Sequence, residues 1–185
     1  EYFDIDWEPA DAALCGKMLA PYLGDQYGNV LAAGELSLEW DEASGEYLVA
    51  YFDARFPLAP ECSDEIAANG IEAYDASRLE GRVRLHALLE RQHYRLAWWR
   101  SAAEEINWRR FFEVSDLIGV RVEREDTREA IHRLPFRLYA EGLIDGARVD
   151  HIDGLADPEG YCRYLRESLC ALNDGRPPGC PTDVP

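Results

Sequence analysis

Four residues with chemically useful side chains stand together late in the chain: Arg148, Asp150, His151 and Asp153. Side chains two residues apart on a strand project from the same face, so Arg148 and Asp150 would point the same way. An arginine beside a carboxylate favours the ionised form and directs it through paired hydrogen bonds. An ionised, oriented carboxylate suits covalent glycosyl transfer, in which it attacks an anomeric carbon while a second group protonates the departing oxygen. An ion pair that only closes the end of a strand explains these residue types equally well.

The segment that would carry these side chains, residues 143–150, reads as a short buried strand that ends in charged residues. A helix is predicted before it, from Asp126 to Gly142 with Pro135 inside, and another after it over 158–172. A helix followed by a strand with polar residues at its carboxyl end is typical of an α/β barrel. The last dozen residues are rich in glycine and proline, and we expect them to be mobile.

The first half of the chain predicts a hairpin and a long helix. Residues 35–53 alternate apolar and polar side chains on either side of a turn cluster, which predicts a β-hairpin. Pro57 and Pro60 are expected to end the strand pairing there, because proline lacks the N–H of the ladder. Apolar residues recur near helical spacing from residue 85 onward, which predicts a helix over about 84–104. Residues 107–113 favour a strand or irregular structure.

The histidines and cysteines do not form a recognisable metal or cofactor site. His86 and His93 lie seven residues apart on one predicted helical face, but no carboxylate or cysteine completes a ligand set with them, His132 or His151. The five cysteines are odd in number and lie far apart, without a C-x-x-C pair, which favours reduced thiols in a cytoplasm. We therefore predict no metal and no cofactor.

Length, composition and charge favour a soluble, folded chain. The 185 residues are 47% hydrophobic and 11% aromatic, which is too apolar for intrinsic disorder. The formal net charge of −17 disfavours binding to nucleic acid through counterion release. No apolar run approaches the roughly 18 residues of a membrane helix, and the first residues do not resemble a signal peptide. We predict a cytoplasmic protein with neither nucleic acid nor a membrane as partner.

Several segments together resemble one enzyme family. The string G-A-R-V-D-H-I-D-G-L at 146–155 is similar to the G-x-R-x-D-x-x-D segment of the alpha-amylase superfamily. Other segments, in their order and spacing, resemble maltooligosyltrehalose synthases: Y-F-D-I-D-W at 2–7, R-F-P-L at 55–58, the run over 85–100 and E-I-N-W-R-R-F-F at 105–112. The resemblance extends over nearly the whole chain.

The resemblance implies an intramolecular transglucosylation that converts the reducing-end α-1,4 linkage of a maltooligosaccharide into an α,α-1,1 linkage. It implies that Asp150 is the nucleophile and Arg148 its orienting partner. His151 and Asp153 are then contacts to the sugar on the leaving-group side. A wall around the freed glucose is the implied role of five consecutive residues: Trp108, Arg109, Arg110, Phe111 and Phe112. Core aromatics with solvated or paired arginines explain these five equally well.

The resemblance also implies the architecture, which is part of a (β/α)8 TIM barrel with a mainly helical inserted domain that carries the hairpin. The inserted domain would cover 1–122, the barrel helix, nucleophile strand and next helix 123–172, and the tail 173–185. The superfamily's D-x-x-x-N-H segment and its glutamate general acid do not occur in the sequence. We therefore expect an internal fragment that is inactive without the remainder of the barrel. Open alternatives are an alpha-amylase-type hydrolase, a glucanotransferase and a non-catalytic carbohydrate-binding module.

Overall fold

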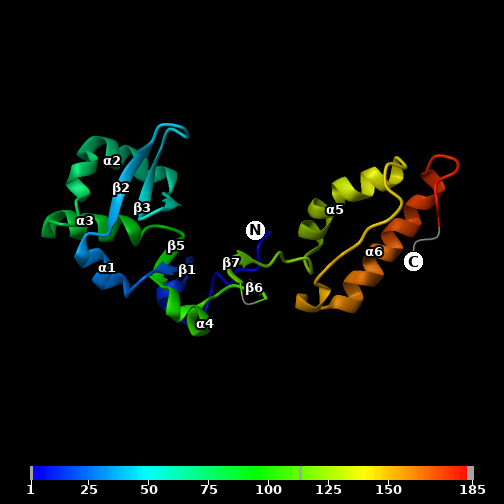
Figure 1. The fold of residues 1–185 in the computed structure, drawn as a ribbon, viewed down its shortest axis with the longest axis horizontal. Helices are drawn as coiled ribbons and strands as arrows, with labels where there is room; N and C mark the ends of the chain where they lie inside the picture. The colour runs from blue at the N-terminus through cyan, green and yellow to red at the C-terminus, as the bar shows by residue number, and fades with distance from the viewer. Residues whose placement is uncertain (1, 113, 183–185) are drawn as a thin grey trace. The chain divides into compact units, whose positions relative to one another are not determined.

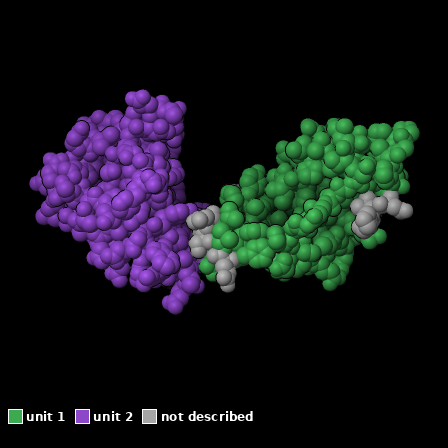
Figure 2. All heavy atoms as spheres, viewed as in Figure 1, with its two compact units in different colours: residues 1–4, 110–185 green, residues 5–109 purple. Residues whose placement is uncertain are grey.

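The computed structural model describes residues 2–112 and 114–182, which divide into two units. Unit 1 consists of residues 1–4 and 110–185, and unit 2 of residues 5–109. Figure 2 colours unit 1 green and unit 2 purple. This division falls earlier in the chain than the predicted domain boundary after residue 122. No helix within the described ranges is both long and apolar enough to cross a membrane.

A three-stranded antiparallel sheet in unit 2 contains the predicted hairpin. β2 (Leu36–Asp41) pairs with β3 (Glu46–Tyr51), and the carboxylate of Asp41 accepts backbone N–H bonds within the turn. The pairing ends at the first of the two prolines, because β4 (Ala54–Pro57) continues along β3 and has Pro57 as its last residue. The strand order β2-β3-β4 makes β4 an edge strand, where the missing N–H of Pro57 is tolerated.

A parallel two-stranded sheet, also in unit 2, joins β1 (Met18–Leu23) to β5 (Tyr94–Trp98). The helix predicted over 84–104 is therefore wrong. α3 (Leu79–Leu89) ends before β5, and α4 (Ala102–Glu105) is a separate short helix after it. The physical reason is that the spacing of large apolar residues changes from the helical period to the period of two residues typical of strands. Tyr94, Leu96 and Trp98 stand at every second position. Leu96, at the centre of β5, is buried in the core.

The main hydrophobic core of unit 2 lies among the three-stranded sheet, the parallel sheet and three helices. α1 (Tyr27–Ala33) and α2 (Ser63–Asn69) join α3 in covering it. Figure 1 shows these elements in blue to green. The fully buried members of the core include Leu23, Val49, Ile66, Leu85 and Leu88. Unit 2 therefore mixes sheets with helices and is not the mainly helical domain that was predicted.

Unit 1 contains a short two-stranded sheet and two long helices (Figure 1). β6 (Arg110–Phe111) pairs antiparallel with β7 (Val114–Ile118). α5 (Glu125–Ala140) and α6 (Pro158–Leu172) lie where the sequence predicts helices, with a proline inside α5. The carboxylate of Asp157 accepts the N–H of Gly160 and caps the start of α6.

Residues 143–150 do not form the predicted buried strand. They are irregular, and the side chains of Leu143 and Val149 are 66% and 41% exposed. A buried parallel strand needs hydrogen-bonded neighbours, and none of the described strands pairs with this segment. The described residues form only small parallel and antiparallel sheets, so they contain no closed barrel.

The tail predicted to be mobile is hydrogen-bonded to α5 through Asn173 and Arg176.

Candidate functional site

Arg148 and Asp150 form the ion pair that the sequence suggested, on an exposed segment. The Arg148 Nε lies 3.2 Å from Asp150 Oδ1, and its Nη2 lies 3.0 Å from Oδ1 and 3.2 Å from Oδ2. The two side chains are 87% and 60% exposed. Such an exposed pair contributes less than about 1 kcal/mol to folding, so its main effect is to direct the carboxylate. The arrangement presents an oriented, solvent-accessible nucleophile.

The residue after Asp150, His151, belongs to a group of three aromatic rings in unit 1. The ring centroid of His151 is 5.3 Å from that of Phe111 and 4.7 Å from that of Phe112, both edge to face. Phe111 and Phe112 also contact each other at 4.7 Å. The two phenylalanine side chains are 38% and 52% exposed, so the group presents apolar ring surface to solvent. Sugars bind such surfaces through their C–H faces.

The backbone is strained at two members of this aromatic group. His151 and Phe112 have φ values of +61° and +54°, in the left-handed region that costs a non-glycine residue about 1–2 kcal/mol. Strain of this kind persists where the surrounding structure imposes it, and it is concentrated at functional sites. Here it turns the chain immediately after Asp150 and immediately after β6.

The remaining predicted site residues are distributed as follows. Asp153 is exposed in the short 3-10 helix Ile152–Gly154, and Arg110 is half-buried in β6 opposite Ile118. Trp108 and Arg109 belong to unit 2. The structure therefore brings five of the nine predicted residues into one neighbourhood of unit 1: Arg148, Asp150, His151, Phe111 and Phe112.

Trp108 is a packing residue of unit 2, as the open alternative allowed. Its side chain is 8% exposed, and its Nε1 donates a hydrogen bond of 2.8 Å to the carbonyl of Leu19. The neighbouring Asn107 accepts the N–H of Leu19 and donates to the carbonyls of Asp6 and Lys17. Sequence reasoning missed Asn107, because one buried asparagine that bonds to three distant backbone groups leaves no local pattern.

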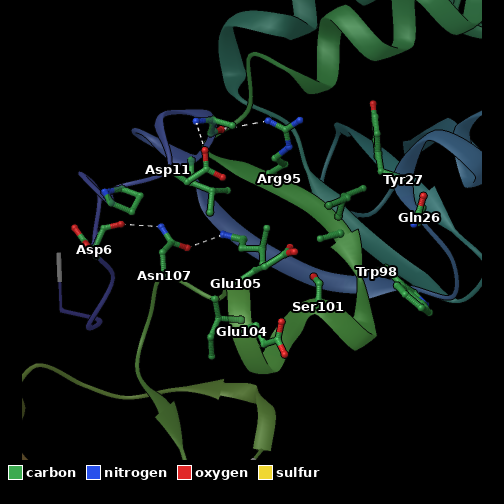
Figure 3. A pocket seen from close by; sticks show the side chains of 17 residues that line it. Asp6, Asp11, Gln26, Tyr27, Arg95, Trp98, Ser101, Glu104, Glu105 and Asn107 are labelled. Atoms are coloured by element: carbon green, nitrogen blue, oxygen red, sulfur yellow. Dashed lines mark hydrogen bonds between the residues drawn. The ribbon is translucent and has the colours of Figure 1, made fainter.

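A cleft of about 690 Å³ in unit 2 was also not predicted. It runs along β5 and the segment after it (Figure 3). Its charged lining is mostly acidic: Asp6, Asp11, Glu104 and Glu105 against Arg95. Within the part of the chain that the structure describes, the side-chain carboxylates of Glu104 and Glu105 have no hydrogen-bond or ion-pair partner. This charge balance disfavours anionic ligands.

Two further polar groups of the cleft are buried donors. Trp98 and Ser101 line the cleft, and the Nε1 and Oγ atoms of these side chains are buried and have no hydrogen-bond partner among the described residues. A buried donor without a partner costs about 1–3 kcal/mol, so both atoms favour a ligand that can accept hydrogen bonds. The exposed carboxylates need the opposite, a ligand that donates. A ligand with hydroxyl groups supplies both.

Two of the four histidines, His86 and His132, are hydrogen-bonded to tyrosines. His86 Nδ1 lies 2.9 Å from the hydroxyl of Tyr27, and His132 Nε2 lies 2.9 Å from that of Tyr161. None of the five cysteines forms a disulfide. Among residues 2–112 and 114–182, no group of three or more histidine, cysteine, aspartate or glutamate side chains is placed to hold a metal ion.

The known proteins compared with this chain below are all maltooligosyltrehalose synthases. No protein-family model matches it. A putative maltooligosyl trehalose synthase of Mycobacterium tuberculosis is 36% identical over 169 residues, which cover 91% of this chain and 18% of the relative. The solved maltooligosyltrehalose synthase from Arthrobacter ramosus is also 36% identical, with a TM-score of 0.62 over 91% of this chain and 18% of that one. A second solved maltooligosyl trehalose synthase is 30% identical, with the same TM-score and coverage.

Proposed function

We propose, from the homology of this chain to a segment of maltooligosyltrehalose synthases, that it forms part of an enzyme that makes trehalosyl ends on maltooligosaccharides. The match over 91% of the chain confirms the resemblance seen in the sequence, and the chain spans only about 18% of the relatives' length. The observation that carries the proposal is the Arg148–Asp150 pair beside an aromatic group. The residue after Asp150, His151, contacts the rings of Phe111 and Phe112.

In the proposed reaction Asp150 is the nucleophile. One of its carboxylate oxygens bonds to the anomeric carbon as the α-1,4 bond breaks, and an acid outside this chain protonates the departing O4. The anomeric hydroxyl of the freed glucose then attacks the same carbon. Its proton passes to the conjugate base of that acid, the α,α-1,1 bond forms, and Asp150 leaves as a carboxylate. Arg148 directs the carboxylate of Asp150 through paired hydrogen bonds in the free enzyme.

The aromatic group is proposed to hold the freed glucose during the transfer. The sugar must turn over and present its anomeric hydroxyl before water reaches the intermediate. Exposed rings at Phe111 and Phe112 offer a surface on which the apolar face of a pyranose can rest while it turns. His151 and Asp153 stand on the same side of the nucleophile in sequence, and we propose them as polar contacts to that sugar.

The described residues cannot complete this reaction alone. A retaining mechanism needs a second carboxylic group, and the proposed partner of this chain is the remainder of a barrel that supplies it. The proposed location is the cytoplasm, with a maltooligosaccharide as substrate and no cofactor.

The test compares two proteins with maltopentaose: the 185-residue chain, and a longer protein that includes the regions homologous to the rest of a maltooligosyltrehalose synthase. Non-reducing trehalosyl product from the longer protein only, abolished by Asp150→Asn, supports the proposal. Shorter reducing sugars in its place would identify a hydrolase or a glucanotransferase. Trehalosyl product from the 185-residue chain would disprove its dependence on the missing acid.

A second candidate function is non-catalytic carbohydrate binding by unit 2, and the cleft favours it. Its carboxylates require hydrogen-bond donors, while Trp98 Nε1 and Ser101 Oγ require acceptors. A sugar hydroxyl is both, whereas an ammonium group only donates.

Titration of maltotriose into the 15N-labelled chain should therefore shift the indole signal of Trp98, which the Trp98→Phe variant identifies. The exposed Trp99 provides the control, because Trp99→Phe should leave the affinity unchanged. Binding that survives Asp150→Asn would assign the sugar to unit 2.

A further inference from the structure

Arg176 is a buried arginine in the tail of unit 1. Its side chain is only 1% exposed, although the sequence around it is rich in glycine and proline. The guanidinium carbon lies 3.9 Å from the ring centroid of Tyr139, and Tyr139 is itself fully buried at the end of α5. A buried charge is stable only when its hydrogen-bonding groups are satisfied.

The guanidinium of Arg176 satisfies its donors on three separate stretches of chain. Nε donates to the carbonyl of Tyr139 at 3.0 Å, and Nη1 donates to the carbonyl of Pro181. Nη2 donates to the carbonyl of Ile144 at 2.9 Å and to the carboxylate of Asp145 at 3.2 Å. The planar fork of an arginine can reach these directions together, which the single ammonium of a lysine cannot.

The stretch held by Nη2 leads directly to the candidate nucleophile. α5 ends at Ala140, and Gly142 reverses the chain with a φ of +73°. From there the chain runs irregularly to Asp150, without a strand partner among the described residues. Ile144 and Asp145 are the points at which Arg176 ties this segment to the helix.

We infer that Arg176 is a positioning residue, which fixes the course of residues 144–150 and thereby the place of Arg148 and Asp150. The catalytic meaning of this role rests on the proposed function, but the tie between Arg176 and the segment does not. Arg176 does not touch Asp150, and it acts through the backbone of Ile144 and the carboxylate of Asp145.

The test uses the 185-residue chain with Arg176→Met and Arg176→Lys. The control is Arg163→Met on α6. The side chain of Arg163 is 62% exposed and pairs with Glu159. Backbone 15N order parameters are measured over 144–149, α5 and α6. In Arg176→Met, the order parameters over 144–149 should fall below about 0.6, the range of a flexible backbone, while those of α6 change little. Arg176→Lys should be intermediate, and the control should leave 144–149 unchanged.

A second readout separates positioning from general stability. The Nε–H signal of Arg148 reports its pair with Asp150, and Asp150→Asn gives the signal of the broken pair. In Arg176→Met this signal should move toward the broken-pair position. If the order parameters over 144–149 and the Arg148 signal are both unchanged in a folded Arg176→Met chain, the inference is wrong.

If Arg176→Met does not fold, Asp145→Ala decides. The Asp145 side chain is 68% exposed, so its loss leaves no buried hole. Lower order parameters confined to 144–149 support the inference, and unchanged order parameters overturn it. Neither readout requires sugar or turnover, so a failure of the proposed transfer reaction would not be mistaken for a failure of this role.

Discussion

The rings of Phe112 and His151 meet edge to face, with centroids 4.7 Å apart and planes at 88°. Both residues have a left-handed backbone, so strain is present on both sides of the contact. The contact joins the turn after β6 to the residue that follows Asp150. It therefore holds exposed aromatic surface beside the candidate nucleophile.

The strain at Phe112 can be measured with a matched pair of variants. Phe112→Ala and Phe112→Gly both remove the ring, but only glycine adopts the left-handed backbone without a steric penalty. We expect the glycine variant to be more stable than the alanine variant by about 1 kcal/mol. Urea unfolding of both variants measures the difference. Equal stability, or a more stable alanine variant, would show that the backbone there is not strained.

Replacement of Asp150 should separate chemistry from folding. Asp150→Asn keeps the shape of the side chain and removes the nucleophile. In the longer protein we expect trehalosyl formation to fall at least about a thousandfold. The free energy of unfolding should change by less than about 1 kcal/mol, because the pair with Arg148 is exposed. Initial rates with maltopentaose and urea unfolding check the two parts, and retained activity would exclude Asp150 as the nucleophile.

Trp108 should matter for stability and not for sugar contact. Trp108→Phe leaves the buried carbonyl of Leu19 without the indole donor, which should cost about 1–3 kcal/mol. The matched control is Trp99→Phe, because Trp99 is 55% exposed and that variant should change stability little. Unfolding followed by circular dichroism compares the two. A neutral Trp108→Phe that weakens maltotriose binding would return Trp108 to the predicted sugar wall.

The stability of unit 1 should depend on pH through His132. Burial is the largest effect and lowers the pKa of its imidazole below 6.5. The hydrogen bond to the carbonyl of Arg128 opposes this shift, and the positive charge of Arg128 adds to it. The folded state therefore favours the neutral ring, which bonds to the carbonyl of Arg128 and the hydroxyl of Tyr161 and lies against the rings of Phe136 and Tyr164. Its contribution is fully present above pH 6.5 and is lost as the pH falls through the lowered pKa, because the unfolded chain takes up the proton first.

Unfolding measured from about pH 7.5 to about pH 5 tests this pH dependence. His132→Phe should flatten the loss of stability over that interval. The exposed His93 of unit 2 gives the control, and His93→Gln should leave the slope unchanged. A slope that persists in His132→Phe would assign the titration to another group.

Patterns within one stretch of sequence predicted much of the secondary structure. The helices α5 and α6 follow from the spacing of their apolar residues, and the pairing of β2 with β3 follows from alternation around a turn. These signals are local, because each element is specified by its own residues and by the groups at its ends.

The elements that sequence reasoning missed depend on distant partners. β5 is a strand because it pairs with β1, more than sixty residues earlier in the chain, and its short alternation was masked by the helix before it. Pro57 does end the pairing, but the third strand β4 that leads up to it was not predicted, because it depends on its pairing with β3. Residues 143–150 have the composition of a buried strand but lack neighbours in the described chain.

The candidate site was predicted only in part for the same reason. Arg148 and Asp150 are two residues apart and form the predicted pair, although the strand from which their common direction was argued is absent. The contact of His151 with Phe111 and Phe112 joins residues far apart in the sequence. The family resemblance implied a role for each of them around the sugar but did not predict this contact. The cleft of unit 2 and the ties of Arg176 have no sequence signature, because each depends on backbone groups that any residue type could supply.

The two units differ in how their interiors are made, and this has a consequence for cooperativity. The hydrophobic core cluster lies entirely in unit 2, whereas the buried apolar side chains described in unit 1 are Val122, Tyr139 and Leu169. Unit 2 has the interior of an independent folding unit, which opens only when its core does. The segments of unit 1 are held together largely by individual hydrogen bonds, such as those of His132 and Arg176, and such bonds can open one at a time. Its candidate nucleophile thus lies in the part of the chain where partial unfolding is least costly.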